Sequence, residues 1–142
     1  MARLGWIRVK DVPTGRDSVV LGSRLELRRF RHLTGFLVAA VRIRRQVRRS
    51  PGALGVSLIA HPTRRTFWTL SAWEDQESLD DFVRTAPHSQ VMERFHARLA
   101  QASFTTWNVP TKQLPEPRSA GEELWREVER RLAATRADTI TV

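Results

Sequence analysis

The stretch that decides the fold runs from Arg65 to Met92 and reads RTFWTLSAWEDQESLDDFVRTAPHSQVM. Residues 66–74 are rich in β-branched and aromatic side chains and predict a strand that ends at a charged boundary. A helix is expected next, because Asp75 suits the N-cap and apolar residues recur three and four positions apart. Pro87 interrupts this pattern, and a second helical segment starts near His88. A histidine and tryptophans therefore meet at a strand-to-helix junction, which indicates a pocket but names no reaction.

Periodic hydropathy predicts the other elements on both sides of this stretch. Alternating apolar and polar residues are typical of strands, and a spacing of three and four is typical of helices. The predicted strands are residues 19–28, 53–61, 66–74 and 103–109, and the predicted helices are residues 33–49, 75–85 and 88–102. Ser119 and Glu122 form a capping-box pattern ahead of a final amphipathic helix.

The resulting order, β-α-β-β-α-β, is the ferredoxin-like arrangement of an α+β domain. We expect one four-stranded sheet with both helices on one face and the other face left open. Such a face must contact something apolar, and a second copy of the chain is the simplest candidate. We assign residues 1–17 to an N-terminal arm, 18–110 to the domain, and 111–142 to a linker and an added C-terminal helix. That helix is expected to pack on its own domain or on a twin subunit.

Composition limits the possible functions. The 142 residues hold no cysteine, so disulfides and thiolate chemistry are excluded. The longest apolar run, residues 36–41, is far too short to span a bilayer. The N-terminal sequence has no secretory h-region, so we expect a cytoplasmic protein with no membrane partner.

The net charge of +9 comes almost entirely from arginine, and several arginines crowd residues 42–49 of one predicted helix. A solvated helix face, in a chain biased toward arginine by composition, is the plainer explanation. A docking patch for nucleic acid is the alternative. No aromatic residues interleave these arginines, which weakens that alternative, and nucleic-acid binding is not expected.

The passage FWTLSAWEDQESLDDFV, followed by APHSQVM, resembles the antibiotic-biosynthesis-monooxygenase group of the dimeric α+β barrel superfamily. The likeness extends over residues 19–109 and is greatest to bacterial members related to the spheroidene monooxygenase type. The shared pattern is a tryptophan closing the third strand, an acidic boundary, Leu-x-x-Phe on the helix, and a histidine shortly before a methionine: Trp73, Leu79, Phe82, His88 and Met92.

This resemblance implies a pocket between sheet and helices that takes a small apolar or aromatic ligand. In cofactor-free members the substrate is an acidic phenolic polycycle that reacts with oxygen as its own anion. That chemistry needs a proton acceptor and a group that holds the anion. The residues of matching type are His88, Trp73, Asn108 and Arg24.

Haem-degrading members of the superfamily imply a second possibility. They carry a strand tryptophan, which Trp73 matches, and a helix histidine that binds iron. The iron-ligand position falls nearer Met92 than His88, and Ser23 replaces the strand asparagine of those enzymes. These departures argue against haem degradation, while haem ligation by His88 or His96 stays open.

Three functions follow. The first is a homodimeric oxygenase-like enzyme that acts on an aromatic or polyene metabolite, either cofactor-free or with haem. The second is a non-enzymatic domain with a binding or structural role. The third and weakest is a nucleic-acid binder that uses residues 42–49. No H-E-x-x-H or similar motif is present, so no metal site is expected.

Overall fold

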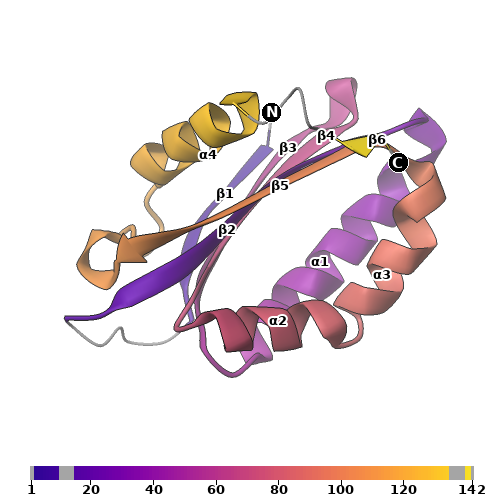
Figure 1. The fold of residues 1–142 in the computed structure, drawn as a ribbon. Helices are drawn as coiled ribbons and strands as arrows, with labels where there is room; N and C mark the ends of the chain where they lie inside the picture. Colours follow the sequence, from indigo (N-terminus) through magenta and orange to yellow (C-terminus); the bar gives the residue numbers. More distant parts are fainter. Residues whose placement is uncertain (1, 10–14, 135–139, 142) are drawn as a thin grey trace.

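A computed structural model of the protein describes residues 2–9, 15–134 and 140–141. One antiparallel sheet, with strand order β1-β3-β4-β2-β5-β6, separates three helices on one face from a fourth on the other (Figure 1). The strands are β1 (Ala2–Arg8), β2 (Asp17–Leu27), β3 (Ala53–His61), β4 (Thr66–Trp73), β5 (Leu99–Pro110) and β6 (Ile140–Thr141). The helices are α1 (Leu33–Arg49), α2 (Gln76–Arg84), α3 (His88–Phe95) and α4 (Glu122–Ala134).

The predicted ferredoxin-like fold is confirmed. β2, α1, β3, β4, the pair α2 and α3, and β5 follow one another in the expected β-α-β-β-α-β order. The helix at residues 33–49 and the strand at 53–61 have the predicted bounds. The segment 1–17, predicted as an arm, contributes β1, which pairs with β3 and extends the sheet.

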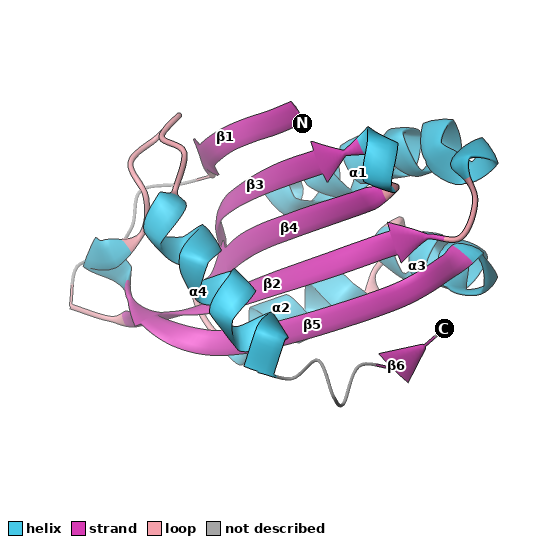
Figure 2. Cartoon of the chain, turned by 90° about the horizontal axis from the view of Figure 1, so that it is seen from above, coloured by secondary structure: helices cyan, strands magenta, loops and turns pink. Residues whose placement is uncertain are grey.

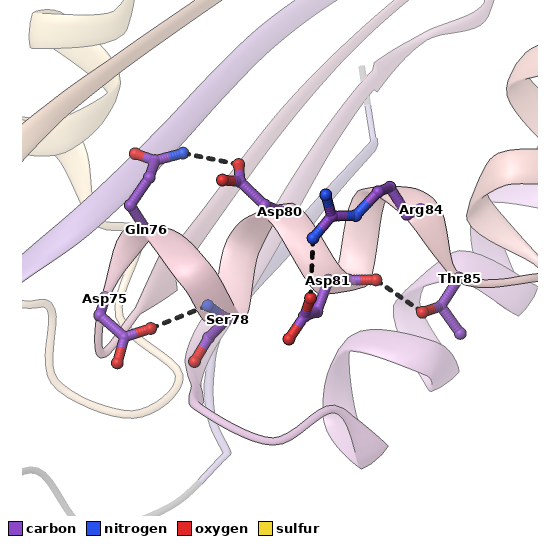
Figure 3. Close-up of polar contacts among 7 residues, drawn as sticks. All are labelled: Asp75, Gln76, Ser78, Asp80, Asp81, Arg84 and Thr85. Carbon is purple, nitrogen blue, oxygen red and sulfur yellow. Dashed lines mark hydrogen bonds and ion pairs between the residues drawn. The ribbon is translucent and has the colours of Figure 1, made fainter.

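The start of α2 follows directly from its sequence. Asp75 has an extended backbone, and its Oδ1 accepts the backbone N–H of Ser78 at 2.8 Å (Figure 3). This hydrogen bond satisfies one of the unpaired amides of the first turn. At the other end, Thr85 Oγ1 donates to the carbonyl oxygen of Asp81 at 2.6 Å, and Arg84 pairs with the Asp81 carboxylate at 2.9 Å. Asp75 is therefore the N-cap that the sequence predicts.

The predicted helix over residues 88–102 is wrong in its second half. α3 ends at Phe95, residues 96–98 form a single 3₁₀ turn, and β5 begins at Leu99. β5 pairs with β2 from its first residue, because Leu99 lies opposite Leu27, and Leu99 is buried in the core. Strand pairing with β2 therefore overrides the helical spacing of the apolar residues in this segment.

The core on the α1, α2 and α3 side of the sheet is aromatic. Phe36 of α1 lies between Phe67 of β4 and Phe95 of α3, with ring centroids 4.6 and 5.2 Å away. Farther along the sheet, Trp73 packs against Phe82 of α2 at 4.8 Å. These contacts fix the helices on the sheet, and they frame a space between the sheet and the helices.

The opposite face of the sheet, which was predicted to be open, is partly covered by the chain itself. α4 crosses over β2 and β5 and buries its apolar stripe there, and it leaves the other end of the strands uncovered (Figure 2). The buried residues of this stripe are Leu124, Trp125, Val128 and Leu132. Gly22 permits the close approach, because a Cβ at this position would lie 2.7 Å from Cγ2 of Val128. The expectation of a wholly open face was wrong, whereas the homodimer stays a prediction.

The capping box predicted before α4 is also wrong. The helix begins at Glu122, so Ser119 is not at the N-cap, and its Oγ is buried without a hydrogen-bond partner among the described residues. The backbone of this linker instead pairs with β1. Trp6 N–H donates to the Ser119 carbonyl at 3.0 Å, and Arg118 N–H donates to the Trp6 carbonyl at 2.7 Å. Pairing with the edge strand therefore decides where the linker ends.

Candidate functional site

A cavity of about 90 Å³ lies between the sheet and helices α1, α2 and α3. Most of its wall is apolar and includes Leu25, Phe36, Ile43, Val56, Phe82 and Met92. Hydroxyl groups, one imidazole and one guanidinium are among its polar groups, and they belong to Ser23, Thr69, Ser71, His88 and Arg44. An apolar cavity with a few convergent polar groups is the usual form of a small-molecule site.

His88, the first residue of α3, brings an imidazole to this cavity. Its Nδ1 lies 3.1 Å from the carbonyl oxygen of Val83. Because a carbonyl can only accept, this contact assigns the proton to Nδ1 and the lone pair to Nε2. Burial lowers the pKa of His88, and the hydrogen bond to Val83 opposes this only in part. His88 is therefore a neutral imidazole near pH 7, with Nε2 able to accept a proton.

Gln46 of α1 fixes the turn that carries His88. Its Oε1 accepts the backbone N–H of His88 at 2.8 Å. Its Nε2 donates to the carbonyl oxygens of Phe82 at 3.2 Å and Thr85 at 3.0 Å. One side-chain amide thus satisfies backbone groups at the end of α2 and at the start of α3. Sequence reasoning missed Gln46, because no local pattern links it to a turn about forty residues away.

Arg44 brings a cation to the same cavity from α1. Its Nε is buried and has no hydrogen-bond partner among the described residues. Burial and the charge of Arg48, one turn away, lower the pKa of Arg44, yet a guanidinium stays protonated at neutral pH. A buried donor without a partner is unfavourable, and an anionic ligand would satisfy it. Sequence reasoning grouped Arg44 with the other arginines of α1, but position 44 lies on the cavity side of the helix, whereas Arg42 and Arg45 are exposed.

The residues predicted to act together are only partly brought together. His88 lines the cavity, whereas Trp73 does not; Trp73 is fully buried and packs against Phe82, which does line it. The indole N–H of Trp73 donates to Ser71 Oγ at 2.9 Å. Asn108 is exposed on β5, where it pairs with Val19, and it is not part of the lining.

Arg24 and His96 lie away from the cavity. Arg24 is on the face of β2 that α4 partly covers, with its guanidinium 5.7 Å from the centre of the Trp68 ring. It also donates to Oε1 of Gln101 at 3.1 Å. Successive strand residues point to opposite faces, so Arg24 and its neighbour Ser23, which lines the cavity, are on different sides of the sheet. His96 is exposed in the 3₁₀ turn after α3.

The cavity does not fit haem. An engineered cavity of about 150 Å³ holds one benzene ring, and the volume here is about 90 Å³. A porphyrin is several times larger than benzene, and His96 does not line the cavity at all. No cluster of three His, Asp or Glu side chains placed to hold a metal ion occurs in the part of the chain that the structure describes. None of the helices in that part combines the length and hydropathy needed to cross a bilayer.

A family model described as a domain of unknown function, DUF3291, matches residues 32–136. The chain belongs to the DUF3291 family. The match includes α1 and α3, so Arg44, Gln46 and His88 all lie within the DUF3291 domain. No curated protein matches the chain.

Solved structures share the fold of this DUF3291 protein. A "putative monooxygenase" from Fusobacterium nucleatum has a TM-score of 0.66 at 10% identity, with 76% of this chain and 49% of that chain covered. SnoaB, a cofactor-independent oxygenase from Streptomyces nogalater, has a TM-score of 0.56 at 14% identity, with 66% and 93% covered. A conserved protein of unknown function from Bacteroides thetaiotaomicron has a TM-score of 0.58 at 14% identity, with 67% and 100% covered.

The DUF3291 chain spans about half the length of the Fusobacterium protein. An antibiotic biosynthesis monooxygenase is a further neighbour, with a TM-score of 0.55 at 15% identity. The predicted resemblance to antibiotic-biosynthesis monooxygenases is therefore confirmed, and at these identities it shows the fold alone.

Proposed function

We propose that this DUF3291 protein is a monooxygenase-like enzyme that binds a small aromatic acid between the sheet and α1, α2 and α3. The observation that carries the proposal is the meeting of Arg44 and His88 in the lining of one apolar cavity. A cation with an unmet donor suits an acidic ligand, and a neutral imidazole suits proton abstraction from it. The fold neighbour SnoaB is a cofactor-independent oxygenase, which supports the same class of chemistry here.

In this proposal His88 Nε2 takes a proton from an acidic CH₂ group of the ligand, and Arg44 stabilises the anion that forms. The anion transfers one electron to dioxygen, and the two resulting radicals combine to a peroxide. His88 returns its proton to that peroxide, which then loses water. The balance is one CH₂ group and one O₂ converted to one carbonyl group and one H₂O, with no external reductant.

The cavity volume limits the ligand. A space of about 90 Å³ excludes a polycycle or a long polyene in the present arrangement of side chains. Met92 and Phe104 line the cavity, and Phe104 is 49% exposed. A flexible methionine and a half-exposed ring can move aside, so the cavity can widen toward this edge. With Met92 and Phe104 moved aside, we assign the cavity a ligand with a single aromatic ring or a comparably small acid.

Oxygen uptake with a panel of small aromatic acids that carry an acidic CH₂ group tests the proposal. We expect His88→Gln to lower the rate by about 100-fold or more, as for loss of a general base. His96→Gln, which changes an exposed histidine outside the cavity, is its matched control. Arg44→Gln is expected to weaken ligand binding by at least about tenfold, and Arg45→Gln on the exposed side of α1 is its control. Equal effects of His88→Gln and His96→Gln would refute the proposal.

A non-enzymatic ligand-binding domain is the second candidate, and the small volume of the cavity favours it. Binding of an acid that depends on Arg44, measured by calorimetry, without oxygen uptake by any member of the panel, would select this function over the first.

The homodimer belongs to the proposal as well. Because α4 occupies part of the sheet face, we assign the second copy to the outer side of α1, where Leu37, Val38 and Val41 are 36%, 58% and 45% exposed. Exposed apolar side chains of this kind mark contact surfaces. Sedimentation velocity should show a dimer for the native chain and a monomer for Val38→Glu. A monomeric native chain would exclude the dimer.

A further inference from the structure

The part of the sheet that α4 leaves uncovered is hollowed into a groove. Two adjoining hollows, of about 370 and 240 Å³, lie between α4 and the end of the sheet near the β3–β4 turn. Both are lined by Arg24, Trp68 and Glu129, so they form one continuous groove. We refer to it as the Arg24 groove, with Arg3, Arg64 and Trp125 as its other principal residues. Figure 2 shows the uncovered end of the strands beside α4. The groove and the cavity that holds His88 lie on opposite faces of the sheet.

The Arg24 groove is strongly positive. Three guanidinium groups, those of Arg3, Arg24 and Arg64, line it together with one carboxylate, that of Glu129. Three positive charges and one negative charge leave a net charge of +2. His61 also lines the groove, but burial and the charges of Arg64 and Arg3 lower its pKa, so it adds little charge near pH 7. The charge of the groove therefore matches a dianion.

Arg24 is held in place for such a ligand. It projects from a central strand, with its guanidinium 5.7 Å from the centre of the Trp68 ring and one nitrogen 3.1 Å from Oε1 of Gln101. No ion pair ties it to a described carboxylate. Stacking on an aromatic ring orients the planar guanidinium, and its remaining N–H groups suit two oxygens of a phosphate or carboxylate.

Two tryptophans give the groove flat apolar walls. Trp68 comes from the sheet and Trp125 from α4. Trp125 is 5% exposed, and its Nε1–H is buried without a hydrogen-bond partner among the described residues. Buried indole N–H groups are normally bonded, so an acceptor supplied by a ligand would satisfy this one. The walls therefore suit a planar ring that carries hydrogen-bond acceptors.

We propose that the Arg24 groove binds a small phosphate monoester that carries a planar, acceptor-bearing ring, such as a nucleoside monophosphate. The phosphate pairs with Arg24 and with Arg64, and the ring lies against Trp68 and Trp125. The combined volume is in the range of small-ligand pockets, about 300–1,000 Å³. This site is separate from the proposed oxygenase cavity, and it stands or falls independently of that function.

Indole NMR signals test the proposal directly. The chain has five tryptophans, whose Nε1–H signals are assigned by single Trp→Phe replacements. The probes are adenosine 5′-monophosphate, adenosine and inorganic phosphate, titrated at constant ionic strength. We expect the monophosphate to shift the signals of Trp68 and Trp125, and adenosine and phosphate each to bind at least tenfold more weakly. Unshifted signals at millimolar monophosphate would overturn the proposal.

Matched arginine variants separate a built site from general attraction to a basic protein. Arg24→Gln and Arg64→Gln should each weaken monophosphate binding at least tenfold by calorimetry. Arg42→Gln, which removes an equal charge from the exposed side of α1, should leave binding unchanged. Because Arg24 is half-buried, circular dichroism checks its fold, and Arg64 in the exposed turn gives a second test. Equal weakening by all three variants would refute the site, as would loss of a dimer in Arg24→Gln, which would show that a second copy occupies the groove.

Discussion

Replacing Gln46 by methionine tests how much its side-chain amide stabilises the turn that carries His88. Methionine has nearly the same length and helix propensity as glutamine, so α1 itself should be undisturbed. The substitution removes three hydrogen bonds, from His88 N–H at 2.8 Å and to the carbonyls of Thr85 and Phe82 at 3.0 and 3.2 Å. The side chain is only half-buried, and water can replace part of what is lost.

A typical protein hydrogen bond contributes about 0.5–1.5 kcal/mol net. With the partly exposed contact to Thr85 at the low end, the three together give an expected loss of about 2 kcal/mol in the free energy of unfolding for Gln46→Met. Urea unfolding followed by tryptophan fluorescence measures this, and the exposed Gln90 of α3 provides the control variant Gln90→Met.

Gln46→Glu tests the same three hydrogen bonds in a second way. The carboxylate can still accept from His88 N–H, but it faces two carbonyl oxygens in place of the amide donor. We expect it to be at least as destabilising as Gln46→Met near pH 7. If Gln46→Met and Gln90→Met both stay within about 0.5 kcal/mol of the native chain, the amide does not hold the turn and the reasoning fails.

Three further predictions concern packing, capping and protonation. Gly22→Ala should lower the free energy of unfolding by about 1–3 kcal/mol, since its Cβ would lie 2.7 Å from Val128 Cγ2. Urea unfolding should show a smaller decrease when the same substitution is made in a Val128→Ala background. If the effects of the two substitutions were strictly additive, the contact would be ruled out. Asp75→Ala should cost about 1 kcal/mol at pH 7. Because the hydrogen bond from Ser78 N–H lowers the pKa of Asp75 from 3.8, this difference should vanish as the pH falls through the lowered value, and a pH-independent difference would contradict the cap. The lowered pKa of His88 means that the imidazole binds a proton more tightly in the unfolded chain than in the folded one, so the stability of the native chain should fall as the pH drops below 6.5. In thermal melts, the His88→Gln variant should lose less stability between pH 7 and pH 5 than the native chain does. An equal loss of stability would argue against a buried neutral imidazole.

Local pattern was enough for the elements whose ends are set by local chemistry. α1 has the predicted bounds, and Asp75 caps α2, because helical spacing and an N-cap side chain act within a few residues. The end of α3 was misplaced, because Leu99 follows the helical stripe of Phe95 yet pairs with Leu27, far away in sequence. The start of α4 was misplaced for the same kind of reason, since Ser119 pairs through its backbone with Trp6.

The candidate site was harder to predict than the fold. His88 could be singled out, because a histidine after a helix-breaking proline stands out in the chain. Arg44 could not be distinguished from Arg45, since only the packing of α1 on the sheet decides which one lines the cavity. Arg24 was grouped with His88 by residue type, but strand alternation places it on the other side of the sheet.

The position of α4 has one consequence for how the fold behaves in dilute solution. A helix or subunit of another molecule that packed on this face of the sheet would dissociate when the protein is diluted. In contrast, α4 is joined to the sheet by a linker of about a dozen residues. Such a linker keeps the effective concentration of α4 at the sheet constant, on the order of millimolar for short linkers. Val20 and Leu70, buried on that face, therefore stay shielded in every single chain. Copies of the protein need not meet for the part of this face beneath α4 to remain dry.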